Sequence, residues 1–183
     1  MESQDERSPA PREPEKAGAE TDSAAKGRTE HGRVFLIVVD ETPEYEKALR
    51  FAARRARRTQ GRVALLHVMP PLDFQNFGAV QDLMANERRQ TAERLLQRVA
   101  AKAQEIAGSM PIIYLREGSP AEQLLKLIAE EPQISVLVLG GATGREGPGP
   151  LVAQLTGRMI GKLRIPITIV PGHIPDADID AVT

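Results

Sequence analysis

Five runs of apolar residues, rich in β-branched side chains, recur along the chain and alternate with segments of helical periodicity. The runs are VFLIVV (34–39), VALLHV (63–68), PIIYL (111–115), ISVLVL (134–139) and ITIV (167–170). Continuous apolar runs of this length are typical of strands that are buried on both faces. Because strands that alternate with helices form βαβ units, the pattern predicts a parallel sheet.

Four helices are predicted between these strands. The first begins at Thr42 and Pro43, an N-cap and a proline at the first helical position, and ends before Gly61. The second is long and ends at Gly108, and the third begins with the capping box SPAE (119–122). The apolar spacing of the fourth helix runs through Leu151, Leu155, Met159 and Leu163.

The predicted fold class is therefore α/β: a five-stranded parallel sheet sandwiched by helices, Rossmann-like, with the flavodoxin-type strand order 3-2-1-4-5. Right-handed crossovers place helices on both faces of such a sheet. Ligands bind beyond the carboxyl ends of the strands, at the switch in strand order. The segments expected at that edge are 40–42, 68–77, 116–119, 140–150 and Pro171.

We expect one domain over residues 33–175, between a disordered N-terminal tail (1–32) and a C-terminal tail (176–183). After Met1, the N-terminal tail holds no Val, Ile, Leu, Phe or Tyr. Such a segment has too little apolar surface to offset the entropy lost on ordering.

Composition excludes several functional classes. With no cysteine there is no disulfide, thiolate nucleophile or thiolate metal site, and a net charge of −1 gives no general attraction to nucleic acid or anionic membrane. No apolar run approaches the ~20 residues that cross a bilayer. The charged N-terminus lacks the apolar segment of a secretory signal, so we expect a cytoplasmic protein.

A segment rich in glycine and proline, GGATGREGPGP (140–150), separates the fourth strand from the fourth helix. Backbone N–H groups at a helix start attract phosphate, and glycine lets the backbone approach a ligand closely. The half from Gly140 to Arg145 keeps every N–H group and adds a positive charge, whereas the GPGP half (147–150) loses two donors to proline. Neither a Walker A lysine nor a dinucleotide-binding fingerprint is present. The segment is predicted to hold phosphate at Gly140–Arg145, with a stiff turn as the alternative.

Five segments, spread over the strands and their junctions, carry a family resemblance. They are RVFLIVVDETPEYEKALRFAARRA (33–56), GRVALLHVMPP (61–71), REGSPAEQLLKLIAEE (116–131), ISVLVLGGATG (134–144) and IPITIVP (165–171). Together they resemble the universal stress protein family over essentially all of residues 33–175. The resemblance implies a five-stranded α/β/α sandwich that commonly dimerises through its last strand, and some members bind ATP or related adenine nucleotides.

Within this resemblance, Asp40 matches the family's adenine-side aspartate and Val68 a position that packs near the adenine. Nucleotide-binding members continue after strand four with Gly-x2-Gly, nine residues, and then Gly-Ser or Gly-Thr. Gly141 and Gly144 supply the first pair, or Gly140 if the match shifts by one, but Gln154-Leu155 or Ala153-Gln154 replaces the second. The alternatives are thus ATP, AMP, another ligand or none. The candidate binding residues are Asp40, Val68, Gly140, Gly141, Gly144 and Arg145.

Other polar residues have simpler interpretations. Asp40 has the alternative role of bonding to N–H groups at the start of the first helix. His67 lies in the second strand, where a histidine is more often a hydrogen-bonded core residue than a ligand. A cluster of arginines complements the negative end of the first helix dipole, with nucleic-acid binding as the alternative. Its members are Arg50, Arg54, Arg55, Arg57 and Arg58.

The expected function is that of a universal-stress-type protein that acts in a stress response by binding, with no catalytic constellation and no metal site. The expected partners are an adenine nucleotide and a second copy of the chain, paired through the edge strand that holds Ile167 and Ile169. Neither nucleic acid nor a membrane is expected. Two alternatives stay open, a slow nucleotide hydrolase on the same fold and a protein-interaction scaffold without a small ligand.

Overall fold

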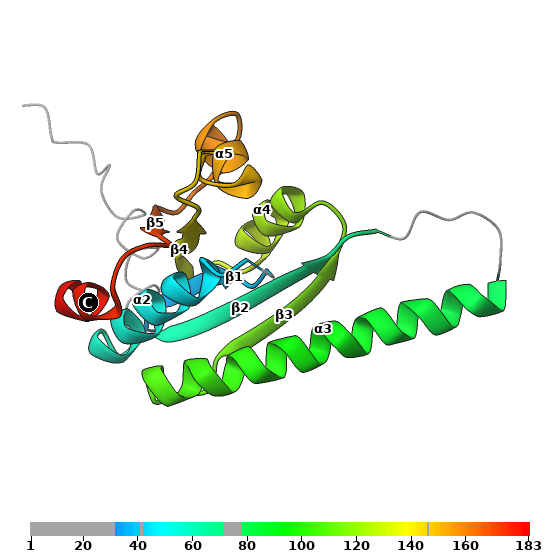
Figure 1. Cartoon of the computed structure of the whole chain (residues 1–183), viewed down its shortest axis with the longest axis horizontal. Coiled ribbons are helices and arrows are strands. Elements are labelled where there is room, and N and C mark those ends of the chain that lie inside the picture. The colour runs from blue at the N-terminus through cyan, green and yellow to red at the C-terminus, as the bar shows by residue number, and fades with distance from the viewer. Residues whose placement is uncertain (1–31, 41, 72–77, 146) are drawn as a thin grey trace, which may run out of the picture. The chain divides into compact units, whose positions relative to one another are not determined.

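A parallel sheet of five strands forms the middle layer of the domain (Figure 1). The computed structural model describes residues 32–40, 42–71, 78–145 and 147–183. The strands follow the order β3-β2-β1-β4-β5, and every neighbouring pair is parallel. This confirms the predicted fold class, the strand order 3-2-1-4-5 and the edge position of β5. The order is that of the Rossmann type, whereas flavodoxin-type sheets have the order 2-1-3-4-5, so that part of the predicted description was wrong. The strands are β1 (Val34–Val38), β2 (Arg62–Met69), β3 (Ile112–Glu117), β4 (Ile134–Gly141) and β5 (Ile167–Pro171).

Helices cover both faces of the sheet. Those in the described residues are α2 (Tyr45–Arg58), α3 (Gly78–Ala107), α4 (Pro120–Glu130), α5 (Pro150–Thr156), the 3-10 turn η1 (Ile160–Lys162) and α6 (Asp176–Val182). Residues of α2, α3 and α6 share one apolar cluster with the sheet, and residues of α4 and α5 share the other. Within the described part of the chain, no helix, α3 included, combines the length and apolar character needed to cross a membrane.

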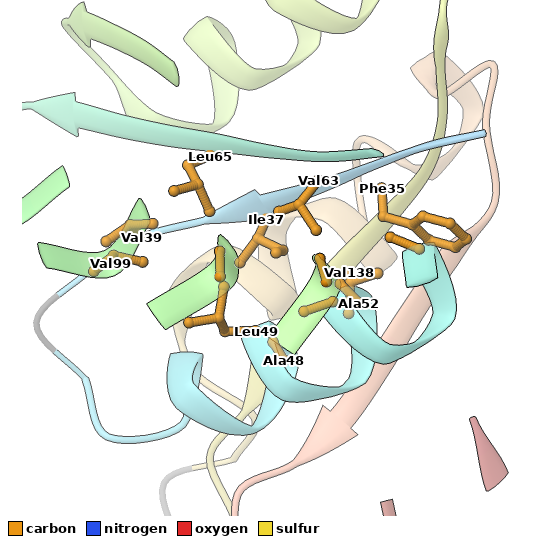
Figure 2. Packing of buried hydrophobic residues seen from close by; sticks show 14 of the residues in the cluster. Phe35, Ile37, Val39, Ala48, Leu49, Ala52, Val63, Leu65, Val99 and Val138 are labelled. Atoms are coloured by element: carbon orange, nitrogen blue, oxygen red, sulfur yellow. The ribbon is translucent and has the colours of Figure 1, made fainter. Parts of the chain in front are cut away.

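The alternation of side chains along β1 explains these two cores. Phe35 and Ile37 point to the α2 and α3 face, whereas Val34 and Leu36 point to the α4 face, and all four are buried. Figure 2 shows the first cluster, in which Ile37 lies among side chains of β2, α2 and α3. An uninterrupted apolar run in the sequence is therefore required, because this strand has no face toward water.

Two helix boundaries differ from the sequence prediction. The first helix begins at Tyr45, since Thr42 and Pro43 lie in a turn before it. The predicted fourth helix ends at Thr156, because Gly157 adopts φ −88° and ψ −102°, outside helical geometry. A separate 3-10 turn follows, so Leu151 and Leu163 do not lie on one continuous helix.

The C-terminal segment also differs from its predicted role as a tail. Residues 176–182 form α6, whose Ile179 is buried in the α2 and α3 cluster. Asp180 of α6 accepts two hydrogen bonds from Arg50 of α2, at 2.8 and 2.6 Å. The compact unit accordingly extends to Thr183. The predicted disordered tail (1–32) lies outside the described residues, except for Gly32.

Candidate functional site

The switch in strand order lies between β1 and β4, and Asp40 follows β1 at this edge. Its Oδ1 accepts hydrogen bonds from the Thr42 backbone N–H at 3.1 Å and from the Thr42 hydroxyl at 2.6 Å. The carboxylate therefore makes a local turn, one of the two roles expected for it. Both bonds use the same oxygen, which leaves Oδ2 outside this turn.

The first two glycines of the loop are explained by close packing. A Cβ atom at Gly140 would lie 2.4 Å from the carbonyl oxygen of Glu44, at the start of α2. At Gly141 it would lie 2.8 Å from Cγ2 of Ile169 on β5. Gly140 is thus required by close packing against backbone, whatever ligand binds nearby, whereas a side chain at Gly141 would have to displace the side chain of Ile169.

Two further residues of the predicted phosphate-binding part of the loop, Gly144 and Arg145, are exposed to solvent. A Cβ atom at Gly144 would meet nothing within 4 Å. The backbone N–H of Ala142 donates to the Pro148 carbonyl at 3.3 Å, which folds the loop back on itself. The described structure does not bring Gly144 or Arg145 to the wall of a cavity at this edge.

A small cavity lies between β1, β4 and the proline half of the loop, and we call it the loop cavity. Its volume is about 110 Å³, well below the roughly 300–1,000 Å³ of typical ligand pockets. Its charged lining residues are two carboxylates, Asp40 and Glu44, with no basic side chain among them. The other lining residues are Val38, Thr42, Tyr45, Leu139, Gly140, Ala142, Pro148, Gly149, Pro150, Leu151 and Val152.

A larger open hollow lies on the other side of Asp40, along α3, and we call it the α3 hollow. Its volume is about 890 Å³, and it shares Asp40 and Tyr45 with the loop cavity. Its other lining residues include His67, Met69, Pro70, Glu87, Arg88, Thr91, Leu95, Arg94 and Arg98. The two spaces together form a continuous candidate binding edge on either side of one carboxylate.

The two β2 candidates, His67 and Val68, face opposite sides of the sheet. Nδ1 of His67 lies 2.7 Å from the carbonyl oxygen of Val39, as expected for a hydrogen-bonded histidine. His67 also lines the α3 hollow, which its position in a strand did not reveal. Val68 is buried in the cluster that contains Leu124 of α4 and lines neither space.

The arginines of the α3 hollow were not among the predicted site residues. The signal was nonetheless in the sequence, because Arg88, Thr91, Leu95 and Arg98 are spaced three or four residues apart and so share one helix face. The described residues contain no group of three His, Asp or Glu side chains arranged to hold a metal ion.

Comparison with known families decides the assignment. The Universal stress protein family matches residues 32–171 of the chain. The chain belongs to this family. The resemblance seen in the sequence is thereby confirmed. No curated protein sequence matches this universal stress protein.

Solved structures of the family have the same fold. One is the universal stress protein UspA from Lactobacillus plantarum, with 16% identity and a TM-score of 0.62, over 76% of this chain and 98% of that one. A family protein from Arabidopsis thaliana with AMP bound has 16% identity and a TM-score of 0.54, over 76% and 91%. A universal stress protein from Archaeoglobus fulgidus in complex with dAMP has 18% identity and a TM-score of 0.50, over 75% and 96%. At these identities the likeness concerns the fold.

Proposed function

We propose that this universal stress protein is a binding module of a stress response, which takes up an adenine mononucleotide at the edge where β1 and β4 separate. The observation that carries the proposal is the pair of adjoining spaces that meet at Asp40, at the position where α/β sheets of this order bind ligands. Two structural relatives, described as bound to AMP and dAMP, support the choice of ligand.

A mononucleotide fits the described edge better than ATP. The Gly-Ser pair that would meet a terminal phosphate is replaced at 154–155, and the loop cavity of about 110 Å³ leaves little room beneath the loop. The proposed role is binding and signalling in the cytoplasm rather than catalysis, because no base and nucleophile pair was found in the sequence.

The proposed assembly is a homodimer joined through β5. Within the described residues β5 pairs only with β4, and the side chain of Ile169 is 40% exposed. An edge strand with exposed β-branched residues presents unpaired backbone groups that a second copy can pair with. Sedimentation of the wild type and of Ile169→Lys tests this: a dimer that Ile169→Lys converts to monomer is expected, and a monomeric wild type contradicts it.

Thermal unfolding of the full chain with adenosine, AMP, ADP or ATP tests the ligand. AMP at a hundred times its Kd adds about 2.7 kcal/mol to stability. That raises Tm by roughly 5 °C or more for a domain of this size. No rise with any of these compounds contradicts nucleotide binding, and phosphate release over time from ADP or ATP contradicts a role in binding alone.

A second candidate function is a protein-interaction scaffold without a small ligand. The proline half of the loop favours it, because Pro148 and Pro150 line the loop cavity and have no backbone N–H group to donate to a phosphate. This scaffold would show no thermal shift with nucleotides and would still dimerise.

A further inference from the structure

We infer that the phosphate of the bound nucleotide is held by Arg94 and Arg98 on α3, and not by the glycine loop. The inference rests on the proposed nucleotide binding and specifies its polarity, with the phosphate on the α3 side of Asp40. The inference follows from the charged side chains that line the loop cavity and the α3 hollow, the two spaces that share Asp40.

The loop cavity is electrostatically unsuited to a phosphate. Its charged lining residues are Asp40 and Glu44, and like charges repel without a cation between them. Arg145, the one cation of the predicted phosphate half, is exposed and lines no part of this cavity. Pro148 and Pro150 at its wall have no N–H group to donate.

The α3 hollow has the opposite balance. Three arginines, Arg88, Arg94 and Arg98, line it against two carboxylates, so its side chains carry a formal charge of +1 (3 − 2). Its volume of about 890 Å³ lies within the range of small-molecule sites. Guanidinium groups recognise phosphate by paired, charge-assisted hydrogen bonds.

The hydrogen bonds on α3 distinguish these arginines from their neighbours. Arg88 donates to the Pro70 carbonyl at 2.6 Å, which fixes its side chain beside the end of β2. Lys102, one turn after Arg98 on the same face, pairs with Glu46 of α2 at 3.1 Å. Arg94 and Arg98 form no ion pair with any described residue, and both are exposed. Nε of Arg94 donates to the Gln90 carbonyl of its own helix at 3.2 Å, which leaves its two terminal NH2 groups for a ligand.

The apolar part of the hollow suits the other half of the ligand. Tyr45 and Leu95 line it and pack against the α2 and α3 core, so they offer a fixed apolar wall. Asp40, like Tyr45, lines both spaces, and a carboxylate accepts hydrogen bonds from an exocyclic amino group. A base at Asp40 and Tyr45 leaves the phosphate on the arginine side.

Binding of adenosine and of AMP to the full chain, measured by calorimetry, tests the inference. The wild type is expected to bind AMP about tenfold or more tighter than adenosine, equivalent to about 1.4 kcal/mol. Arg98→Ala and Arg94→Ala should each remove much of that difference and leave adenosine affinity unchanged. Arg145→Ala should change neither affinity.

Arg89→Ala is the matched control, since Arg89 lies on the same helix, pairs with Glu93 at 3.0 Å and does not line the hollow. It should bind both ligands like the wild type. A loss of AMP affinity in Arg145→Ala, with Arg94→Ala and Arg98→Ala unaffected, would overturn the inference while leaving nucleotide binding intact. Failure of the wild type to bind either ligand would overturn both.

Discussion

Arginines line two separate hollows in this universal stress protein, and their surroundings differ. Besides the α3 hollow, a space of about 600 Å³ lies between the ends of α2, α3 and α6, which we call the α6 hollow. Its lining includes Arg50, Arg54, Arg57, Arg58 and Asp180. The α6 hollow has more arginines than the α3 hollow. It is nevertheless the weaker candidate for an anion site, because Arg50 and Arg54 are paired with the carboxylate of Asp180.

The partners explain the difference. In the α6 hollow, Arg50 and Arg54 both pair with Asp180. Outside the hollow, Lys47 of α2 pairs with Asp176 of α6 at 2.8 Å. The hollow also adjoins the C-terminal end of α2, where the helix dipole is negative and opposes an anion. These arginines attach α6 to α2, whereas Arg94 and Arg98 on α3 have no such described partner. In this protein the density of arginines in the sequence therefore does not mark the binding site, because the acidic helix α6 packs against the densest run.

The largest effect is expected from removing the apolar anchor of α6. Ile179 is 1% exposed, and truncation of a buried Ile to Ala costs about 2–5 kcal/mol. Ile179→Ala should lower the stability of the whole domain by that amount in urea unfolding. The exposed Val182→Ala, on the same helix, is the control and should have little effect. Equal stabilities for both variants and the wild type would show that α6 is not part of the folded unit. Asp180 would then not pair with Arg50 and Arg54, and the difference between the two hollows would disappear.

A smaller loss of stability is expected from a substitution at the start of the glycine loop, at Gly140. In Gly140→Ala the new methyl group would lie 2.4 Å from the Glu44 carbonyl oxygen, so the start of α2 or the end of β4 must shift, at a cost of about 1–3 kcal/mol. Gly144→Ala meets no atom within 4 Å and should stay within about 0.5 kcal/mol of the wild type. Thermal unfolding measures both. Comparable losses in the two variants would show that Gly144 also has a structural role.

Acid should weaken the attachment of α6 through its aspartates. The hydrogen bond from Arg50 holds the pKa of Asp180 below its ordinary value, and the bond from Lys47 does the same to the pKa of Asp176. Because the folded values are lowered, the stabilisation is complete above the ordinary value of about 3.9 and is lost as the pH falls below it, through the folded values.

Comparison of the wild type with Asp180→Asn measures this dependence. The wild type should be the more stable at pH 7, and the difference in urea midpoint should shrink toward pH 3. A difference that is constant over this range would mean that the ion pairs do not hold α6.

The fold could be predicted from sequence because it depends on local patterns. Apolar runs such as VFLIVV (34–39) predict strands with two buried faces, and their alternation with helices predicts a parallel sheet with helices on both faces, as observed. The boundary error at Gly157 arose because apolar spacing continues through Leu163 although the backbone departs from the helix. Spacing alone does not report where a glycine breaks a helix.

The candidate site was predicted less well, because it depends on contacts between distant segments. Asp40 and Gly140 were placed at the correct edge, since strand ends are visible in the sequence. The contact of Gly140 with Glu44, and the meeting of Arg98 with Asp40 at one hollow, join residues far apart in the chain. The helix α6 was missed for the same reason, because its stability comes from Arg50 and the core rather than from its own seven residues.

The smallest effect on AMP affinity is expected from the arginines in the arginine-rich second half of α2. Arg57 and Arg58 are exposed and line the α6 hollow, away from Asp40 and the binding edge. The double variant Arg57→Ala/Arg58→Ala should therefore fold normally and bind AMP within about twofold of the wild type, while Arg98→Ala loses affinity about tenfold. Calorimetric titration of both variants under one salt condition compares the hollows directly, because the double variant loses two charges and would be the weaker binder if only nonspecific attraction mattered. If removing Arg57 and Arg58 weakened AMP binding as much as removing Arg98, the number of arginines would matter more than their partners.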